Sequence, residues 1–203
     1  ERARRCLGQF DEVSMVVTAT ETMNRKNVNA SIADSMKEFG EIVRQAKGNG
    51  LRVRGSIGVA FVCPYEGQTP PEQTLRLAGD YFRLGVDELL LADTIGRANP
   101  PQVYDLVLRI REEWPDRVLA LHFHDTYHMA LANSLAGLQA GVGIFDASVG
   151  GLGGCPFAPR AAGNVATEKL VFMLHEMGIR TGIDYDGLLK AAEFAQGLGG
   201  AQS

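Results

Sequence analysis

The chain has 203 residues, of which 45% are hydrophobic and 22% are charged, a balance typical of a folded globular domain. Its formal net charge of −4 offers no broad basic face to nucleic acid, and no apolar run reaches the roughly 20 residues that cross a bilayer. We therefore expect neither nucleic acid nor a membrane among its partners. The three cysteines, an odd number, favour a reducing compartment over a disulfide-bonded secreted protein.

The first part of the chain predicts a strand followed by a helix. Residues 13–18 are rich in β-branched side chains and predict the strand. The polar segment 20–27 that follows is expected to be a loop. Ser31, with Asp34 three residues later, predicts the start of an amphipathic helix that ends at Gly48.

Two more units of the same kind follow. Residues 51–62 predict a second strand, which leads through the turn 63–67 to a helix that begins at Pro70-Pro71 and stops before Gly85. Residues 88–92 predict a third strand, and Pro100 marks the start of the helix after it.

The last part of the chain repeats the pattern. Strands are predicted at 118–121 and 142–146, each followed by a helix, and a further helix at 185–195 closes the chain. Strict alternation of strand and helix implies an α/β fold with a parallel sheet and right-handed crossovers.

Polar residues collect at one end of this predicted sheet. Thr20, Asp93, the run 122–125 and Asp146 lie at or just past the C-terminal ends of strands. That end carries the active site of a (β/α)8 barrel and the ligand crevice of an open doubly wound sheet, so either fold implies one site. Five βα units are too few for an eight-stranded barrel of about 250 residues. We therefore expect three N-terminal strands to be missing from this chain.

His122 and His124 are the leading candidates for chemistry. If the strand continues through His124, both side chains point to the same face, because strand side chains alternate with a period of two. Two imidazoles on one face can bind one metal ion. The alternative is a histidine pair that only packs and forms hydrogen bonds at a strand end.

Cys155 lies on a loop with four glycines, Gly150, Gly151, Gly153 and Gly154. Such a loop could fold over a substrate and bring a weak acid to it. The alternatives are a surface turn with an inert thiol and a phosphate-binding loop, although no Gly-Lys-Ser/Thr sequence follows.

Other polar residues have equally good structural explanations. Asn164 directly precedes a predicted helix, where an N-cap role is favoured over a ligand role by sequence alone. Asp93 could cap a loop or a helix, and Glu168 in the first helical turn gains from the helix dipole wherever it points. Lys26 and Asn27 follow the first predicted strand, where they could contact a ligand or belong to a solvated loop.

Six segments together resemble the hydroxymethylglutaryl-CoA lyase family, within the TIM-barrel metallolyases that include isopropylmalate and homocitrate synthases. The resemblance covers nearly the whole chain. Its segments are 24–29 (Asn-Arg-Lys-Asn-Val-Asn), 63–67 (Cys-Pro-Tyr-Glu-Gly), 92–96 (Ala-Asp-Thr-Ile-Gly), 122–127 (His-Phe-His-Asp-Thr-Tyr), 151–156 (Gly-Leu-Gly-Gly-Cys-Pro) and 163–168 (Gly-Asn-Val-Ala-Thr-Glu).

The resemblance implies a (β/α)8 TIM barrel, with residues 1–203 as a single catalytic domain that carries about the last five βα units and a C-terminal helix. It implies cleavage of 3-hydroxy-3-methylglutaryl-CoA to acetyl-CoA and acetoacetate, as in ketone-body formation and leucine degradation, with Mg²⁺ or Mn²⁺. It also implies a homodimer in a bacterial cytoplasm or a mitochondrial matrix, and not a secreted protein. The residues that it assigns are His122, His124 and Asn164 to the metal, Cys155, Asp93 and Glu168 to catalysis, and Lys26, Asn27 and Thr94 to the substrate.

Two departures from the family keep other functions open. Family members carry an Arg-Asp pair on their first strand that has no match here, and His128 replaces a usual glycine. A Claisen-type acyltransferase like isopropylmalate or homocitrate synthase uses the same histidine pair, although the Cys155 loop argues against it. A catalytically silent, acyl-CoA-binding barrel fragment is the alternative that the missing strands suggest.

Overall fold

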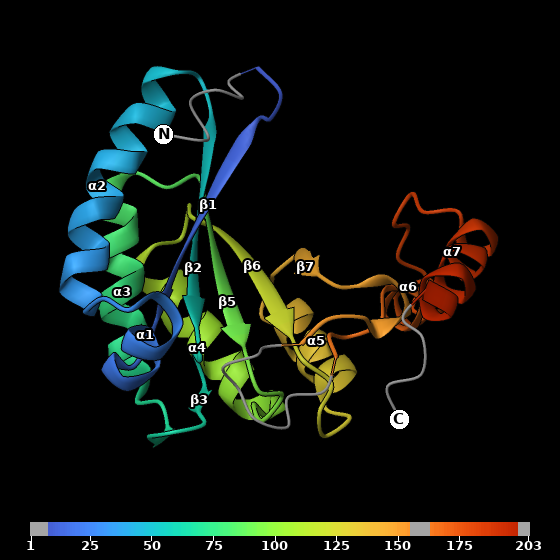
Figure 1. Ribbon diagram of the computed structural model, residues 1–203. Helices are drawn as coiled ribbons and strands as arrows, with labels where there is room; N and C mark the ends of the chain where they lie inside the picture. Colours follow the sequence, from blue (N-terminus) through green and yellow to red (C-terminus); the bar gives the residue numbers. More distant parts are fainter. Residues whose placement is uncertain (1–7, 155–162, 199–203) are drawn as a thin grey trace.

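A five-stranded parallel sheet forms the centre of the protein, seen here in a computed structural model that describes residues 8–154 and 163–198 (Figure 1). Each strand pairs with the next along the sheet, in the order β1-β2-β5-β6-β7. The strands are β1 (Glu12–Thr18), β2 (Arg52–Gly58), β5 (Glu88–Asp93), β6 (Val118–Phe123) and β7 (Ile144–Asp146). The predicted parallel α/β sheet is confirmed.

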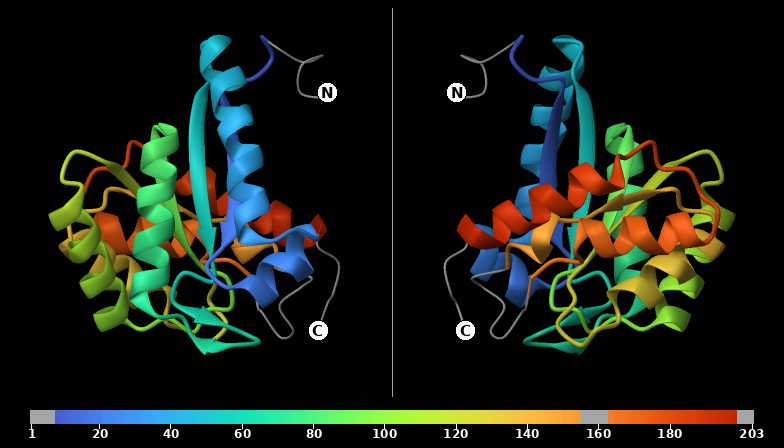
Figure 2. Two further views of the ribbon diagram at one scale, coloured as in Figure 1. Left: turned by 90° about the vertical axis from the view of Figure 1, so that its left-hand side faces the viewer. Right: turned by 90° about the vertical axis from the view of Figure 1, so that its right-hand side faces the viewer.

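Helices connect successive strands and cover one face of the sheet, and two further helices follow the last strand. They are α1 (Glu21–Val28), α2 (Ile32–Gly48), α3 (Pro71–Leu84), α4 (Pro100–Glu113), α5 (Ala130–Gln139), α6 (Thr167–Glu176) and α7 (Tyr185–Leu198). Figures 1 and 2 show α2 and α3 alongside β1 and β2, with α6 and α7 beyond β7. Among the described helices, none is both long and apolar enough to span a membrane.

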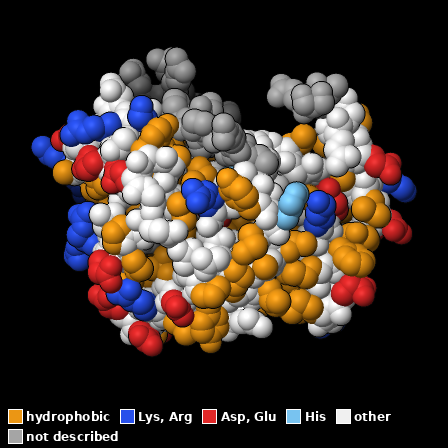
Figure 3. Space-filling view, turned by 90° about the horizontal axis from the view of Figure 1, so that it is seen from below, with side chains coloured by type: hydrophobic (Ala, Val, Ile, Leu, Met, Phe, Trp, Pro, Cys, Tyr) orange, Lys and Arg blue, Asp and Glu red, His pale blue; other side chains and the backbone are white. Residues whose placement is uncertain are grey.

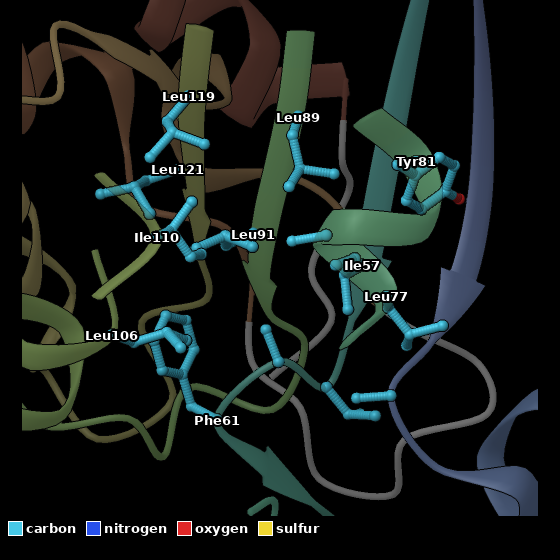
Figure 4. Packing of buried hydrophobic residues seen from close by; sticks show 14 of the residues in the cluster. Ile57, Phe61, Leu77, Tyr81, Leu89, Leu91, Leu106, Ile110, Leu119 and Leu121 are labelled. Carbon is cyan, nitrogen blue, oxygen red and sulfur yellow. The ribbon is translucent and has the colours of Figure 1, made fainter. Parts of the chain in front are cut away.

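The hydrophobic core lies between the sheet and these helices. Leu91 of β5, Leu121 of β6 and Ile110 of α4 are fully buried, and Figure 4 shows their side chains pointing toward one another. The Tyr81 hydroxyl lies 3.0 and 3.1 Å from the carbonyl oxygens of Met15 and Ser56, so it can donate to either strand. Alternate strand residues therefore pack under the helices and leave the opposite face for other roles.

Local signals set several helix ends as predicted. The Ser31 hydroxyl accepts a hydrogen bond from the backbone N–H of Asp34 at 3.0 Å, which confirms it as the N-cap of α2. Asn99 and Gln102 form a reciprocal capping box at the start of α4. Gly85 ends α3 in the left-handed conformation that glycine tolerates best.

The loop prediction for residues 20–27 is wrong, because α1 occupies this segment. Its anchor is polar: the fully buried Asn24 side chain accepts from the Thr18 N–H at 3.0 Å and donates to the Ala30 carbonyl at 3.0 Å. A buried amide with partners can hold a helix in place without an apolar stripe.

The second strand ends at Gly58, and the prediction that it extends to Val62 is wrong. Val59 has a φ of +47°, which ends the extended conformation. Its N–H donates to the Thr94 hydroxyl at 2.9 Å, and its carbonyl accepts from the Thr69 hydroxyl at 2.8 Å. The chain then forms a small hairpin of β3 (Val62–Cys63) and β4 (Gly67–Gln68).

Figure 3 views the protein from the end at which the parallel strands finish. Side chains of both charges are interspersed with hydrophobic ones on this face. The candidate site residues lie at this end of the sheet.

Candidate metal centre

The two histidines lie together at the end of β6. The ring centroids of His122 and His124 are 5.2 Å apart, with the rings edge to face. The strand ends at Phe123, but His124 extends the pairing through an isolated antiparallel bridge to Asn164. The predicted proximity of the two imidazoles is confirmed.

Asn164 reaches the histidines through backbone pairing across 40 residues of sequence. On either side of the bridge, the Val165 N–H donates to the Phe123 carbonyl at 2.9 Å and the Asp125 N–H donates to the Gly163 carbonyl at 3.0 Å. The N-cap of α6 is Ala166, so the N-cap interpretation of Asn164 is wrong. The same backbone pairing therefore places all three expected metal ligands in one region.

The orientation of the Asn164 amide leaves its oxygen available. Its Nδ2 donates to the Leu152 carbonyl at 2.8 Å, whereas its Oδ1 is buried and has no hydrogen-bond partner among the described residues. A buried carbonyl oxygen without a partner is costly, and a divalent cation would offset that cost. The donor set of two imidazoles and one amide oxygen therefore fits a divalent metal ion.

His122 favours the neutral form that binds metals. Burial lowers the pKa of His122, and the neighbouring His124 lowers it further. The negative charge of Asp146, its register partner on β7, opposes this shift. Because the net shift is downward from an ordinary value of about 6.5, the imidazole is neutral at pH 7.

No cluster of three or more His, Cys, Asp or Glu side chains that could hold a metal ion occurs within residues 8–154 and 163–198. The candidate centre thus depends on the two histidines and an amide. Mg²⁺ and Mn²⁺ accept such oxygen and nitrogen donors and complete an octahedral shell with further oxygen ligands.

The glycine-rich loop lies directly beside the candidate centre. The Gly150 N–H donates to Glu168 Oε2 at 3.0 Å, and Leu152 is held by Asn164. A Cβ atom on Gly163 would lie 1.8 Å from the Gly151 carbonyl oxygen, so the two backbones touch. Cys155 itself lies outside the described residues, but the segment that leads to it is tied to Asn164 and Glu168.

Asp93 lies next to the histidines but is occupied by its own loop. Its two carboxylate oxygens accept hydrogen bonds from the N–H groups of Arg97 at 3.0 Å and Ala98 at 2.9 Å. Burial raises the pKa of Asp93 to about 6, and the backbone hydrogen bonds partly oppose this shift. The geometry matches the loop-capping interpretation, and the Asp93 carbonyl contacts the His124 N–H at 3.3 Å.

The three expected substrate-binding residues lie on different segments that follow β1 and β5. Thr94 supports the Val59 backbone through its hydroxyl, as described above. The Lys26 ammonium lies 4.9 Å from the centroid of the Tyr65 ring, and Asn27 is half-buried on α1. Lys26 and Thr94 thus contact Tyr65 and Val59, and neither of these two contacts involves the histidines.

Sequence reasoning missed an ion-pair network on the face of the sheet opposite the helices. Arg54 of β2 pairs with Glu88 of β5 at 2.5 Å and with Asp146 of β7 at 2.9 Å. The available signal was a charged side chain in the middle of a strand whose later residues are buried. Such a residue indicates an inward-facing charge that needs a partner.

The model of the HMGL-like family matches residues 2–195. Among curated proteins, the cytoplasmic 3-hydroxy-3-methylglutaryl-CoA lyase of Danio rerio is 46% identical over 184 residues, which are 91% of this chain and 55% of that protein. A hydroxymethylglutaryl-CoA lyase of Bacillus subtilis is 43% identical over 189 residues, covering 93% and 63%. The chain thus spans a little over half of the length of these relatives.

Solved structures give the same result. An HMG-CoA lyase from Brucella melitensis superposes with a TM-score of 0.89 at 42% identity, covering 94% of this chain and 67% of that one. An HMG-CoA lyase from Acinetobacter baumannii, in complex with coenzyme A and 3-methylmalate, gives a TM-score of 0.90 at 40% identity, covering 97% and 64%.

Proposed function

The chain belongs to the HMGL-like family, and we propose that the protein containing it is a divalent-metal-dependent lyase that cleaves 3-hydroxy-3-methylglutaryl-CoA to acetyl-CoA and acetoacetate. The observation that carries the proposal is the convergence of His122, His124 and the unpartnered Asn164 Oδ1. In this proposal residues 1–203 belong to a single (β/α)8 barrel domain, and the five strands form one arc of it.

His122, His124 and Asn164 would hold Mg²⁺ or Mn²⁺. When bound, the ion would lower the pKa of the substrate's tertiary hydroxyl and orient the bond that breaks. The protein contributes two imidazoles, of which His122 is kept neutral by burial, and an amide whose orientation is fixed, because Nδ2 is held by the Leu152 carbonyl. The centre is therefore preorganised from the protein side.

The reaction is a retro-Claisen cleavage. The tertiary hydroxyl passes its proton to water, and the electron pair of that O–H bond forms the ketone of acetoacetate as the carbon–carbon bond breaks. The released electron pair becomes the enolate of acetyl-CoA, which must then take up a proton. We assign proton donation to the Cys155 thiol, which in the sequence follows the segment 150–152 that Glu168 and Asn164 hold beside the centre.

The remaining site residues have supporting roles in this proposal. Glu168 anchors the glycine-rich loop, and Asp93 fixes the loop after β5 behind the histidines. Lys26, Asn27 and Thr94 contact the coenzyme A portion of the substrate from the segments after β1 and β5. A neighbouring lyase structure contains coenzyme A, which supports an acyl-CoA as the ligand.

The names of the relatives favour the lyase over a Claisen-type acyltransferase or a silent acyl-CoA-binding fragment. These relatives include proteins named cytoplasmic and mitochondrial. We propose a homodimer that acts in a bacterial cytoplasm or a mitochondrial matrix and is not secreted.

The test measures acetoacetate release from 3-hydroxy-3-methylglutaryl-CoA by the intact protein, first treated with a chelator and then supplied with Mg²⁺ or Mn²⁺. Activity should disappear on chelation, return with the ion, and be lost in His122→Ala. His128→Ala is the matched control, because the His128 side chain is 90% exposed and lies only a few residues from the centre. Full activity of His122→Ala, or none in the metal-supplied parent protein, would contradict the proposal.

A further inference from the structure

A single arginine links three strands on the open face of the sheet. Arg54 Nη1 lies 3.0 and 2.9 Å from the two carboxylate oxygens of Asp146, and its Nη2 lies 2.5 Å from Glu88 Oε1. The Arg54 side chain is 19% exposed and that of Glu88 is 5% exposed. Both partners of this pair are therefore largely withdrawn from water.

The link connects strands that are not neighbours. Two strands, β5 and β6, lie between β2 and β7 in the sheet. The Arg54 side chain reaches β7 only because the sheet curves, with Arg54 and Asp146 on its concave face. One side chain therefore spans the distance between β2 and β7 across that face.

The far end of the link lies next to the candidate metal centre. β7 has three residues and pairs with β6 at three positions, the last of which joins Asp146 to His122. A strand this short has few backbone hydrogen bonds to hold it in position. The ion pair with Arg54 therefore adds a constraint on the strand that flanks His122.

Stability alone is a poor explanation for this arrangement. Removing a guanidinium and a carboxylate from water costs several kcal/mol per ion, and apolar side chains of similar size are often equally stabilising. A bidentate arginine–carboxylate pair provides geometry instead, because its planar fork fixes distance and orientation together.

We infer that Arg54 is a positioning residue for the metal centre, which it serves by holding Asp146 and β7 against His122. The inference rests on the proposed function, since it assigns His122 to a metal ion. Metal-binding histidines commonly depend on neighbouring groups that fix the ring, and the loss of such a group typically weakens metal binding about 10–100-fold.

Arg52 provides a matched control on the same strand and the same face. Within the described residues its ion pairs are to Glu12 at 3.7 Å and Glu88 at 3.8 Å, and its side chain is 61% exposed. Glu12 also lies 3.7 Å from Arg54 Nε. Arg52→Gln therefore removes one positive charge from the network without breaking the link to β7.

The first measurement uses the intact protein without metal. Hydrogen exchange of the backbone N–H groups of β7 should be faster in Arg54→Gln and in Asp146→Asn than in the parent, and unchanged in Arg52→Gln. Arg54→Gln leaves the buried Glu88 unpaired and could prevent folding. Asp146→Asn keeps the Arg54–Glu88 pair, so the exchange of this variant decides the outcome in that case.

The second measurement is the affinity for Mn²⁺, followed by the electron paramagnetic resonance signal of the free ion. Arg54→Gln and Asp146→Asn should bind Mn²⁺ about 10–100-fold more weakly, Asp146→Glu should recover part of the loss, and Arg52→Gln should match the parent. If the parent protein bound no Mn²⁺, the proposed metal function would be refuted, and with it the role of Arg54 toward the metal. Unchanged β7 exchange in both variants, or faster exchange with parental Mn²⁺ affinity, would overturn the inference while leaving the lyase proposal intact.

Discussion

The substitution Gly163→Ala adds one methyl group, which should push the glycine-rich loop away from the metal centre. A Cβ on Gly163 would lie 1.8 Å from the Gly151 carbonyl oxygen and 3.3 Å from that of Gly153. Its φ is outside the left-handed region, so the cost of Gly163→Ala is steric and not conformational. Because real Cβ contacts essentially never fall below 3.0 Å, the two backbones must separate by about 1.2 Å.

The displacement acts on the contacts that hold the loop. The hydrogen bonds from Asn164 Nδ2 to Leu152 and from Gly150 N to Glu168 are 2.8 and 3.0 Å long. Each is worth roughly 1–2 kcal/mol, so loop attachment should weaken by on the order of 3 kcal/mol. A displacement of about 1 Å in a catalytic group can cost about 100-fold in rate, and we expect kcat to fall by about that factor.

The assay is kcat for acetoacetate release by the intact Gly163→Ala protein, with Mn²⁺ affinity measured in parallel. Gly143→Ala is the control, because its Cβ would meet no atom within 4 Å and its φ is likewise outside the left-handed region. A parental kcat in Gly163→Ala would refute the argument that close contact of these backbones positions the loop.

Three further outcomes follow from single side chains. The pKa of Asp93 is raised to about 6 from an ordinary value of about 3.9, so the folded state binds an extra proton between these values. Stability should therefore fall by on the order of 3 kcal/mol as pH rises through that window, and denaturant unfolding of Asp93→Asn should show no such slope. Glu168→Ala should lower kcat with unchanged Mn²⁺ affinity. Glu168→Gln should retain most activity, because it keeps an acceptor for the Gly150 N–H. Equal losses of kcat in both variants would indicate that Glu168 does not act by anchoring the loop. Tyr81→Phe should reduce the free energy of unfolding by roughly 1–2 kcal/mol at unchanged kcat, because its buried hydroxyl bonds strand carbonyls on the helix side of the sheet.

The alternation of strands and helices was predictable because each element carries a strong local signal. Ser31, Pro71 and Gly85 mark helix ends, and the period-two alternation in β6 predicts that His122 and His124 lie together. These signals depend only on residues close in sequence, so no tertiary information is needed to interpret them.

Other features were missed because a polar side chain can either be exposed to solvent or be buried with hydrogen-bond or ion-pair partners. The sequence places Asn24 in a polar segment that was interpreted as a loop, so α1 was not predicted. Arg54 was not identified from the sequence, although it is the centre of an inward-facing network. In both cases burial depends on partners distant in sequence, such as Asp146, which is 92 residues from Arg54.

The role of Asn164 shows the same limit for the site. Its position just before a helix predicts an N-cap, and only the antiparallel bridge to His124 shows that its backbone belongs beside the strand end. A pairing between residues 40 positions apart has no local signature. The resemblance to a known family supplied what spacing alone did not.

The conformation of Val59 also bears on the order in which the protein folds. A β-branched residue at a φ of +47° is disfavoured by roughly 1–2 kcal/mol, so an isolated segment around it populates other conformations. Its N–H finds the Thr94 hydroxyl only once β5 has paired with β2. We therefore expect this turn to form after the transition state, so that mutations there accelerate unfolding and leave the refolding rate nearly unchanged.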